Sequence, residues 1–322
     1  MKYSLIIPVY NRPAEVRDLL ESLKRLSYRD FEIIVVEDGS SSPCDGVVSA
    51  YMNGGDGLDL HYFSKENSGP GGTRNYGAER AGGEYLIFLD SDVTVPEGYF
   101  EAIDKELEND PADAFGGPDR ADNSFTPVQK AINYSMTSFF TTGGIRGGKK
   151  KLDRFYPRSF NMGIRKYAFE DLGGFSDMRY GEDIDLSIRI FKAGYRCRLF
   201  PEAWVVHKRR TDFKQFFRQV RHSGMARIEL YLKYPDSLKP VHLLPSAFTI
   251  ASAALLLAGF KWHTAWFLLF LYAFLIFTDS SWKNGGDMKT GVLSVAAAFV
   301  QLSGYGTGFI EAWWRRCVLK KD

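Results

Sequence analysis

Apolar and polar residues come in regular blocks over the first 235 residues. Residues 3–9, 31–37 and 84–89 are apolar runs followed by turn residues, which is typical of strands buried on both faces. Residues 13–26 have apolar side chains at every third or fourth position and predict a helix. A strand, a helix and a second strand in this order predict a parallel pair with a right-handed crossover. We therefore expect an α/β fold with a doubly wound, mostly parallel sheet, to which the same pattern adds a strand at 60–64 and a helix at 73–81.

Beyond residue 241 the chain becomes strongly apolar. Residues 246–260 and 262–278 are almost uncharged, and residues 290–310 form a third apolar stretch. A membrane-spanning helix needs about 20 apolar residues, so the first two stretches predict a tight membrane hairpin. The alternative is a buried, soluble helical subdomain, which is difficult to build from two such long runs. We predict a catalytic domain over residues 1–235 and transmembrane or interfacial helices over residues 236–322.

The last residues resemble an interfacial membrane anchor. They combine Trp313 and Trp314 with Arg315, Arg316 and two further lysines, a composition that belongs on the cytoplasmic side of a membrane. Three full crossings would place them on the side opposite the catalytic domain. Either the third apolar stretch lies in the interface or re-enters, or the positive-inside rule fails here.

Composition narrows the class of protein. The chain has 41 Lys and Arg against 39 Asp and Glu, and this near balance argues against a nucleic-acid-binding protein. Its three cysteines, Cys44, Cys197 and Cys317, are scattered and predict reduced thiols. The first apolar run is too short for a cleavable signal sequence. We therefore expect the catalytic domain in the cytoplasm, attached to a cytoplasmic or inner membrane.

Acidic and aromatic residues follow three of the predicted strands. Tyr10 comes after the first strand, Glu37 and Asp38 end the second, and Asp90 and Asp92 follow the strand at 84–89. Ligands of such sheets bind at the carboxyl ends of the strands. Two carboxylates that share one face repel each other unless a cation such as Mg²⁺ or Mn²⁺ lies between them. An ordinary turn is the alternative explanation for Asp90 and Asp92.

Two further segments contain candidate functional residues. Glu182 and Asp183 begin an amphipathic segment that ends near Gly194, and His207 follows an apolar run. Acidic residues are common in the first turn of a helix because they complement its dipole. A single histidine after a strand is more often structural than functional. By themselves, these residues leave both interpretations open.

Taken in order, the motifs resemble those of the inverting family 2 glycosyltransferases with a GT-A fold. The resemblance covers roughly residues 1–235 and is carried by the segments at 4–12, 31–40, 67–77, 83–92, 173–175 and 181–183. The family usually has Asp-Asp-Gly-Ser where this chain has Glu37-Asp38-Gly39-Ser40. Asp38, the counterpart of the carboxylate that recognises the base, is therefore kept.

The resemblance implies a donor side and an acceptor side. On the donor side, the base, ribose and diphosphate of a nucleotide-sugar would contact Pro8, Tyr10, Asp38, Glu37, Arg74 and Asp90. The metal, Mg²⁺ or Mn²⁺, would be held by Asp92 and His207. On the acceptor side, Asp183 would be the base that deprotonates the acceptor hydroxyl, Glu182 would orient the acceptor or its loop, and Asn161 would lie in an acceptor or donor-sugar loop. The cations at 208–210 would neutralise the leaving diphosphate or contact anionic lipids.

The resemblance predicts metal-dependent, inverting transfer of a single sugar to a membrane-proximal glycan or lipid-linked acceptor in cell-surface polysaccharide or glycoconjugate synthesis. Asp38 favours a UDP-sugar, with guanosine and thymidine as alternatives. A processive polysaccharide synthase is a second hypothesis, but no Trp follows Arg221 as its signature requires. A catalytically inactive binding or scaffold module is a third, and the retained Asp92 and Asp183 argue against it.

Overall fold

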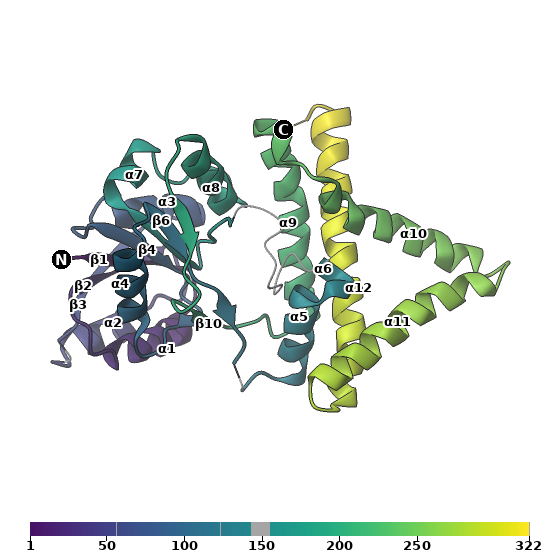
Figure 1. Cartoon of the computed structure of the whole chain (residues 1–322), viewed down its shortest axis with the longest axis horizontal. Coiled ribbons are helices and arrows are strands. Elements are labelled where there is room, and N and C mark those ends of the chain that lie inside the picture. Colours follow the sequence, from purple (N-terminus) through teal and green to yellow (C-terminus); the bar gives the residue numbers. More distant parts are fainter. Residues whose placement is uncertain (56, 123, 143–154, 322) are drawn as a thin grey trace. The chain divides into compact units, whose positions relative to one another are not determined.

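The computed structural model describes residues 1–55, 57–122, 124–142 and 155–321, which form two compact units. The sheet unit comprises Met1–Asp122 and Arg154–Lys208, and the helical unit comprises Asn123–Asp153 and Arg209–Asp322 (Figure 1). The predicted boundary at residue 235 differs from this division. Helices α5 (Pro127–Thr137) and α9 (Phe213–Lys233) belong to the helical unit, because Ile132 and Phe216 pack against Ala297 of α12 (Met288–Trp313).

The sheet unit is built on a mostly parallel sheet. In the described part of the chain this sheet has seven strands in the order β3-β2-β1-β4-β8-β6-β9, and β8 runs antiparallel to its neighbours β4 and β6. The strands are β1 (Tyr3–Val9), β2 (Phe31–Asp38), β3 (Asp59–Lys65), β4 (Tyr85–Leu89), β6 (Ala114–Gly116), β8 (Asn161–Arg165) and β9 (Cys197–Leu199). A smaller sheet joins β5 (Val93–Thr94), β10 (Val205–His207) and β7 (Asp119–Arg120). The predicted α/β fold is confirmed.

Helices cover both faces of the large sheet, which explains why its central strands β1, β2 and β4 are largely apolar and buried. In β1, Leu5 and Ile7 pack with the helices of one face and Ile6 with those of the other, because successive side chains point to opposite faces. One face is covered by α1 (Pro13–Lys24), α2 (Asp45–Met52) and α4 (Tyr99–Asn109). The other is covered by α3 (Gly69–Ala78), α7 (Lys166–Asp171) and α8 (Glu182–Lys192).

The helical unit contains the apolar stretches predicted from the sequence. Among the described residues, three helices are long and apolar enough to cross a membrane: Pro240–Ala258, Thr264–Lys283 and Met288–Val318. The first includes α10 (Leu244–Ala258), the second is α11, and the third is α12 extended by a π-helical turn, Trp314–Val318. Their composition indicates membrane association, as expected.

The close packing of α3 on the sheet gives a first prediction. A Cβ on Gly77 would lie 2.7 Å from Ile6 Cγ2, whereas a Cβ on Gly46 in α2 would meet nothing within 4 Å. Gly77→Ala therefore overpacks the core and should lower the free energy of unfolding by about 1–3 kcal/mol. Gly46→Ala, the matched control, should be neutral or stabilising by up to about 1 kcal/mol, because Ala favours the helix. Thermal unfolding in detergent compares the two, and equal stability would show that α3 does not need this close approach.

Candidate active site

The carboxyl ends of β1, β2 and β4 lie at one edge of the sheet, because these strands are parallel and adjacent. Tyr10, just past β1, is 54% exposed, and Pro8 is half-buried. The turn after Tyr10 is fixed by Asn11, whose Oδ1 accepts a hydrogen bond from Ser42 N at 2.8 Å. The Tyr10 ring is therefore exposed at the edge of the sheet where β2 ends with Asp38 and where Asp90 follows β4.

Asp38 is buried and holds the start of α3. Its Oδ1 accepts a hydrogen bond from Ser68 N at 2.9 Å, and its Oδ2 accepts one from Gly69 N at 3.0 Å. Lys65 Nζ also donates to Oδ1 and forms an ion pair with it. A carboxylate offers about four acceptor positions, so about one remains for a ligand.

Glu37 has its partners within the fold. It is buried, and its carboxylate accepts hydrogen bonds from Cys44 N at 2.7 Å, from Tyr62 Oη at 3.4 Å and from the Ser40 hydroxyl. These contacts fix the turn after β2. The structure therefore places Glu37 behind the edge that Tyr10 and Asp38 form rather than on its surface.

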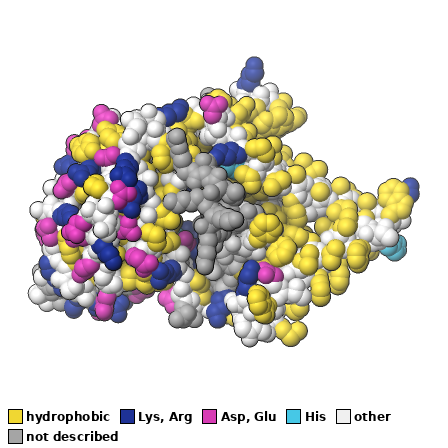
Figure 2. Space-filling view, in the orientation of Figure 1, with side chains coloured by type: hydrophobic (Ala, Val, Ile, Leu, Met, Phe, Trp, Pro, Cys, Tyr) yellow, Lys and Arg dark blue, Asp and Glu magenta, His cyan; other side chains and the backbone are white. Residues whose placement is uncertain are grey.

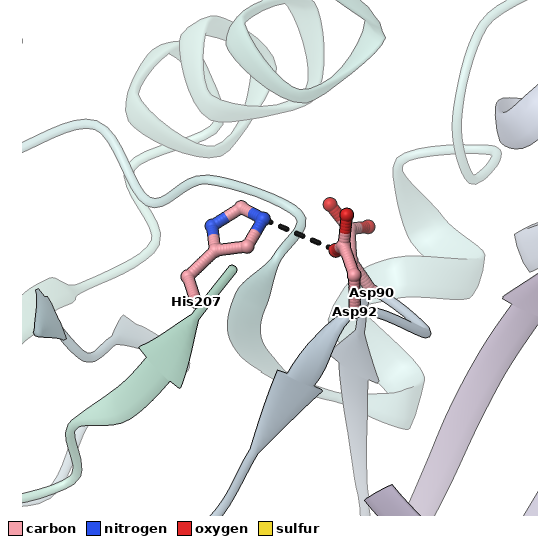
Figure 3. Close-up of side chains that lie close together, drawn as sticks. All are labelled: Asp90, Asp92 and His207. Carbon is pink, nitrogen blue, oxygen red and sulfur yellow. Dashed lines mark hydrogen bonds and ion pairs between the residues drawn. The ribbon is translucent and has the colours of Figure 1, made fainter. Parts of the chain in front are cut away.

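Asp90, Asp92 and His207 come together although His207 lies 115 residues after Asp92 in the sequence (Figure 3). The pairing of β10 with β5 sets His207 opposite Val93, next to Asp92. His207 Nε2 lies 3.1 Å from Asp92 Oδ1, and one ligand atom from each of the three residues lies within 4.8 Å of the others. Two ligands on opposite sides of one Mn²⁺ or Mg²⁺ ion are about 4.2 Å apart, so the set needs only a small adjustment to hold an ion.

Arg12, at the start of α1, forms an ion pair with the Oδ2 of Asp92. The Asp92 carboxylate thus has the imidazole on one oxygen and a guanidinium on the other. Arg12 is not among the candidate residues predicted from the sequence. Its position directly after the first strand end was the available signal, but its partner is 80 residues away in the sequence.

Arg74 joins the end of β4 to the start of α8. Its Nη2 donates to Asp90 Oδ1 at 2.7 Å, and its Nη1 donates to Glu182 Oε1 at 2.9 Å. The side chain is buried, and its guanidinium lies 5.5 Å from the ring centre of Phe175. A buried charge is tolerated when it is paired and hydrogen-bonded, so these two acids account for Arg74.

Asp183 lies beside Glu182 in the first turn of α8, and both side chains are buried. Its Oδ1 accepts a hydrogen bond from Ile184 N at 2.8 Å, and its Oδ2 accepts one from Arg158 Nε at 2.5 Å. Arg158 lies just before β8 in a segment without a clear pattern, and the sequence analysis did not single it out.

The pKa values of the two neighbouring acids, Glu182 and Asp183, are shifted in opposite directions. Burial raises the pKa of the Glu182 carboxyl, the negative charge of Asp183 raises it further, and Arg74 only partly offsets both effects. Burial also acts to raise the pKa of Asp183, but the charge and hydrogen bond of Arg158 outweigh it, and the pKa of Asp183 ends below its ordinary value. Opposite shifts in adjacent acids are typical of sites that divide acid and base roles. Here Asp183 is the member held as a carboxylate.

Some predicted residues lie outside this constellation. Asn161 is 1% exposed; its Oδ1 accepts a hydrogen bond from Tyr99 Oη at 2.6 Å and its Nδ2 donates to Ala203 O at 2.7 Å. Its amide therefore joins β8 to the loop before β10 and has no group directed at the sheet edge. Lys208 forms an ion pair with Asp18, and Arg209 donates to Asn133 Oδ1 at 3.0 Å within the helical unit.

The mostly parallel sheet with helices on both faces, together with the paired acids at one sheet edge and the second acid pair at the start of α8, has the architecture of the GT-A fold. A match to the family described as "Glycosyl transferase family 2" covers residues 4–173, which is more than half of the chain. The chain belongs to this family.

Two curated relatives carry glycosyltransferase names. The "Pre-mycofactocin glycosyltransferase" of Mycobacterium tuberculosis is 30% identical over 243 residues, covering 74% of this chain and 49% of the relative. The "Probable glycosyltransferase YdaM" of Bacillus subtilis is 29% identical over 225 residues, covering 68% of this chain and 53% of the relative. The chain thus spans about half the length of these relatives.

Solved structures share the fold. The mannosyltransferase PcManGT from Pyrobaculum calidifontis, solved with GDP-Man and Mn²⁺, is 20% identical with a TM-score of 0.65, covering 92% of this chain and 86% of that chain. S. aureus TarS 1-349, solved with UDP, is 22% identical with a TM-score of 0.52, covering 72% of this chain and 66% of that chain.

The Arg158–Asp183 pair gives a prediction about pH. Arg158→Gln removes the positive charge that lowers the pKa of Asp183, so that pKa rises. A base works only when ionised, and the loss of sugar transfer on the acidic side should therefore occur at a higher pH in the variant. Arg158→Lys keeps the charge and should leave the acidic limb close to that of the wild type. Transfer rates measured across pH compare the three proteins, and an unshifted limb in Arg158→Gln would show that Asp183 does not control it.

Proposed function

We propose that this protein is a metal-dependent, inverting glycosyltransferase that moves a single sugar from a nucleoside-diphosphate sugar onto an acceptor hydroxyl at the cytoplasmic face of a membrane. The observation that carries the proposal is the division of the acids into two sets. Asp90 and Asp92 with His207 form one set, Glu182 and Asp183 form the other, and Arg74 joins them. Transfer needs such a division, because the leaving diphosphate and the attacking hydroxyl require opposite chemical assistance.

On the donor side, Tyr10 and Asp38 would recognise the base. The exposed Tyr10 ring offers a stacking surface, and the remaining acceptor position of Asp38 suits the N3–H of uracil. UDP is therefore the nucleotide we favour. The loop that Asp38 holds opens α3, so base recognition and the placement of Arg74 depend on the same carboxylate.

Asp92, His207 and Asp90 would hold a divalent cation. The donor set fits Mn²⁺ better than Mg²⁺, because Mg²⁺ prefers oxygen ligands alone and one of these three donors is an imidazole nitrogen. A bound divalent ion supplies charge stabilisation to a departing diphosphate. Arg12 adds a permanent positive charge beside Asp92.

On the acceptor side, Asp183 would take the proton. The acceptor hydroxyl gives its proton to the Asp183 carboxylate, its oxygen bonds to the anomeric carbon, and the bond from that carbon to the diphosphate oxygen breaks. The nucleoside diphosphate leaves with the electron pair of that bond. Attack from the face opposite the leaving group inverts the anomeric carbon. Arg158 keeps Asp183 ionised before the acceptor arrives. Arg74 holds Glu182 in place, and Glu182 would orient the loop around the acceptor.

The helical unit supports a membrane-bound acceptor. Its apolar helices indicate that the enzyme works at a membrane, where a lipid-linked or membrane-proximal glycan is at hand. The cationic residues that follow the third apolar helix favour the cytoplasmic side of the membrane. The retained acids of both sets favour an active transferase over an inactive binding module.

The proposed ion site gives a prediction that does not depend on knowing the acceptor. Asp92→Asn and His207→Gln should each weaken Mn²⁺ binding at least about tenfold, because each removes one of three ligands. Free Mn²⁺ measured by electron paramagnetic resonance reports the binding directly. Hydrolysis of the donor sugar should fail in EDTA and return with Mn²⁺.

Asp18→Asn is the matched control, since Asp18 makes an exposed ion pair with Lys208 outside the three-residue set. It should bind Mn²⁺ as the wild type does. Unchanged Mn²⁺ binding in Asp92→Asn, or full hydrolysis in EDTA, would overturn the metal assignment.

A further inference from the structure

The third apolar helix, α12, is bound along its length to the highly charged helix α9. Phe216 near the start of α9 packs with Ala297, and Ile228 near its end packs with Phe309 and Ala312. Residue numbers rise together in both helices, so the two run parallel and side by side, as Figure 1 shows.

The contact between α9 and α12 is close because glycines line it. A Cβ on Gly224 of α9 would lie 2.1 Å from the carbonyl oxygen of Tyr305, and a Cβ on Gly308 of α12 would lie 2.1 Å from that of Arg221. Ion pairs follow further along the helices. Arg221 pairs with Glu311, and Arg316 Nε lies 3.1 Å from Glu229 Oε1. The two helices therefore form one rigid pair from Ala297 to Arg316.

Helix α9 cannot lie in the hydrocarbon core of a membrane. Its 21 residues include seven basic or acidic side chains: Lys214, Arg218, Arg221, His222, Arg227, Glu229 and Lys233. Each Lys or Arg at the centre of a membrane helix costs about 2.5–3.5 kcal/mol by insertion measurements, and several together would far outweigh the apolar residues between them. Since α12 is bound along α9, α12 must stay outside the hydrocarbon core as well.

Burial within the protein already accounts for the apolar composition of α12. In its most apolar window, 44% of the helix is buried inside the protein, against 6% for Pro240–Ala258 and 11% for Thr264–Lys283. Its apolar side chains face α9 and α5, and Ser294 of α12 forms a buried hydrogen bond with Ser280 of α11 at 2.7 Å. Helix α12 is therefore covered by protein to a much greater extent than the other two helices.

Helices α10 and α11 have the opposite character. They leave α12 and meet at the turn over residues 259–263 (Figure 1), and hydrophobic side chains cover their surface (Figure 2). Leu257 is 73% and Phe260 76% exposed. The apolar span that contains α10, Pro240–Ala258, has 19 residues and α11 has 20, which at 1.5 Å per residue match the roughly 30 Å hydrocarbon core. Lys261 stacks over Trp262 in the turn, and this combination is typical of a membrane–water interface.

We infer that, within the described residues, α10 and α11 are the two membrane crossings, and that α12 lies with α9 along the membrane surface on the side where α9 begins. The inference rests on the membrane attachment in the proposed function and adds its topology. It places Arg315, Arg316 and the final lysines on the same side as the sheet unit. The cationic end of the chain then obeys the positive-inside rule, which three crossings would violate.

Labelling of single cysteines with a membrane-impermeant maleimide tests this topology. In a full-length background of Cys44→Ala, Cys197→Ala and Cys317→Ser, one exposed lysine is replaced at a time. Lys105→Cys marks the sheet unit, Lys261→Cys marks the turn between α10 and α11, and Lys321→Cys marks the end of the chain. Intact cells and sealed inverted vesicles present the two sides of the membrane, and labelling in detergent confirms that each thiol is reactive.

We expect the cysteines at 105 and 321 to be labelled from the same side and the cysteine at 261 from the opposite side. Labelling of 321 from the side of 261 would show that α12 crosses and would overturn the inference. Labelling of 261 from the side of 105, or from neither side, would overturn the crossing by α10 and α11. Recovery of the full-length protein in the high-speed supernatant without detergent would instead remove the membrane attachment, and with it that part of the proposed function.

Discussion

The site depends on the ion pairs that the buried guanidinium of Arg74 forms with two acids. Arg74 lies in α3, and the carboxylate of Asp38 accepts hydrogen bonds from the backbone at the start of this helix. The Arg74 side chain donates hydrogen bonds to Asp90, just after β4, and to Glu182, at the start of α8. Breaking a buried charge pair by removing one partner typically costs about 3–5 kcal/mol, because the remaining charge is left uncompensated. Arg74 therefore fixes the distance between the acid set of Asp90 and the acid set of Glu182. A donor and an acceptor would bind between these two sets.

Each acid that we assign to catalysis or metal binding forms an ion pair with an arginine. Asp92 has Arg12, Asp90 and Glu182 share Arg74, and Asp183 has Arg158. The three arginines come from the start of α1, from α3 and from the segment before β8. Each pairing neutralises a carboxylate that would otherwise repel its neighbours at the edge of the sheet. The arrangement fixes the acids in place, which is the preorganisation that stabilises the charge developing on a leaving diphosphate.

The sequence was most informative where a pattern is local. The strand at Tyr3–Val9 was predicted with its observed bounds, because a strand buried on both faces has a continuous apolar run and ends at polar turn residues. The helix expected at 73–81 begins earlier, at Gly69, because Asp38 accepts hydrogen bonds from the backbone of Ser68 and Gly69 and stabilises a glycine-rich start that local propensity disfavours.

The features that the sequence did not reveal depend on distant partners. Arg12 and Arg158 gain their roles from acids 80 and 25 residues away, and nothing in the local sequence predicts those pairs. Asn161 fits the family motif, yet Tyr99 and Ala203 occupy its amide. The boundary at residue 235 placed α9 with the sheet, because an amphipathic pattern predicts an apolar face without identifying the element that covers it. For α9 that element is α12, some 80 residues later.

We assign Asp183 to the acceptor and not to the donor. Asp183→Asn keeps the shape of the side chain and removes its basicity. Donor affinity, measured by calorimetric titration, should match that of the wild type, while sugar transfer in a single turnover should fall by about 10²-fold or more, the usual worth of a positioned base. Transfer at nearly the wild-type rate, or a loss of donor affinity with transfer unchanged per bound donor, would contradict the account.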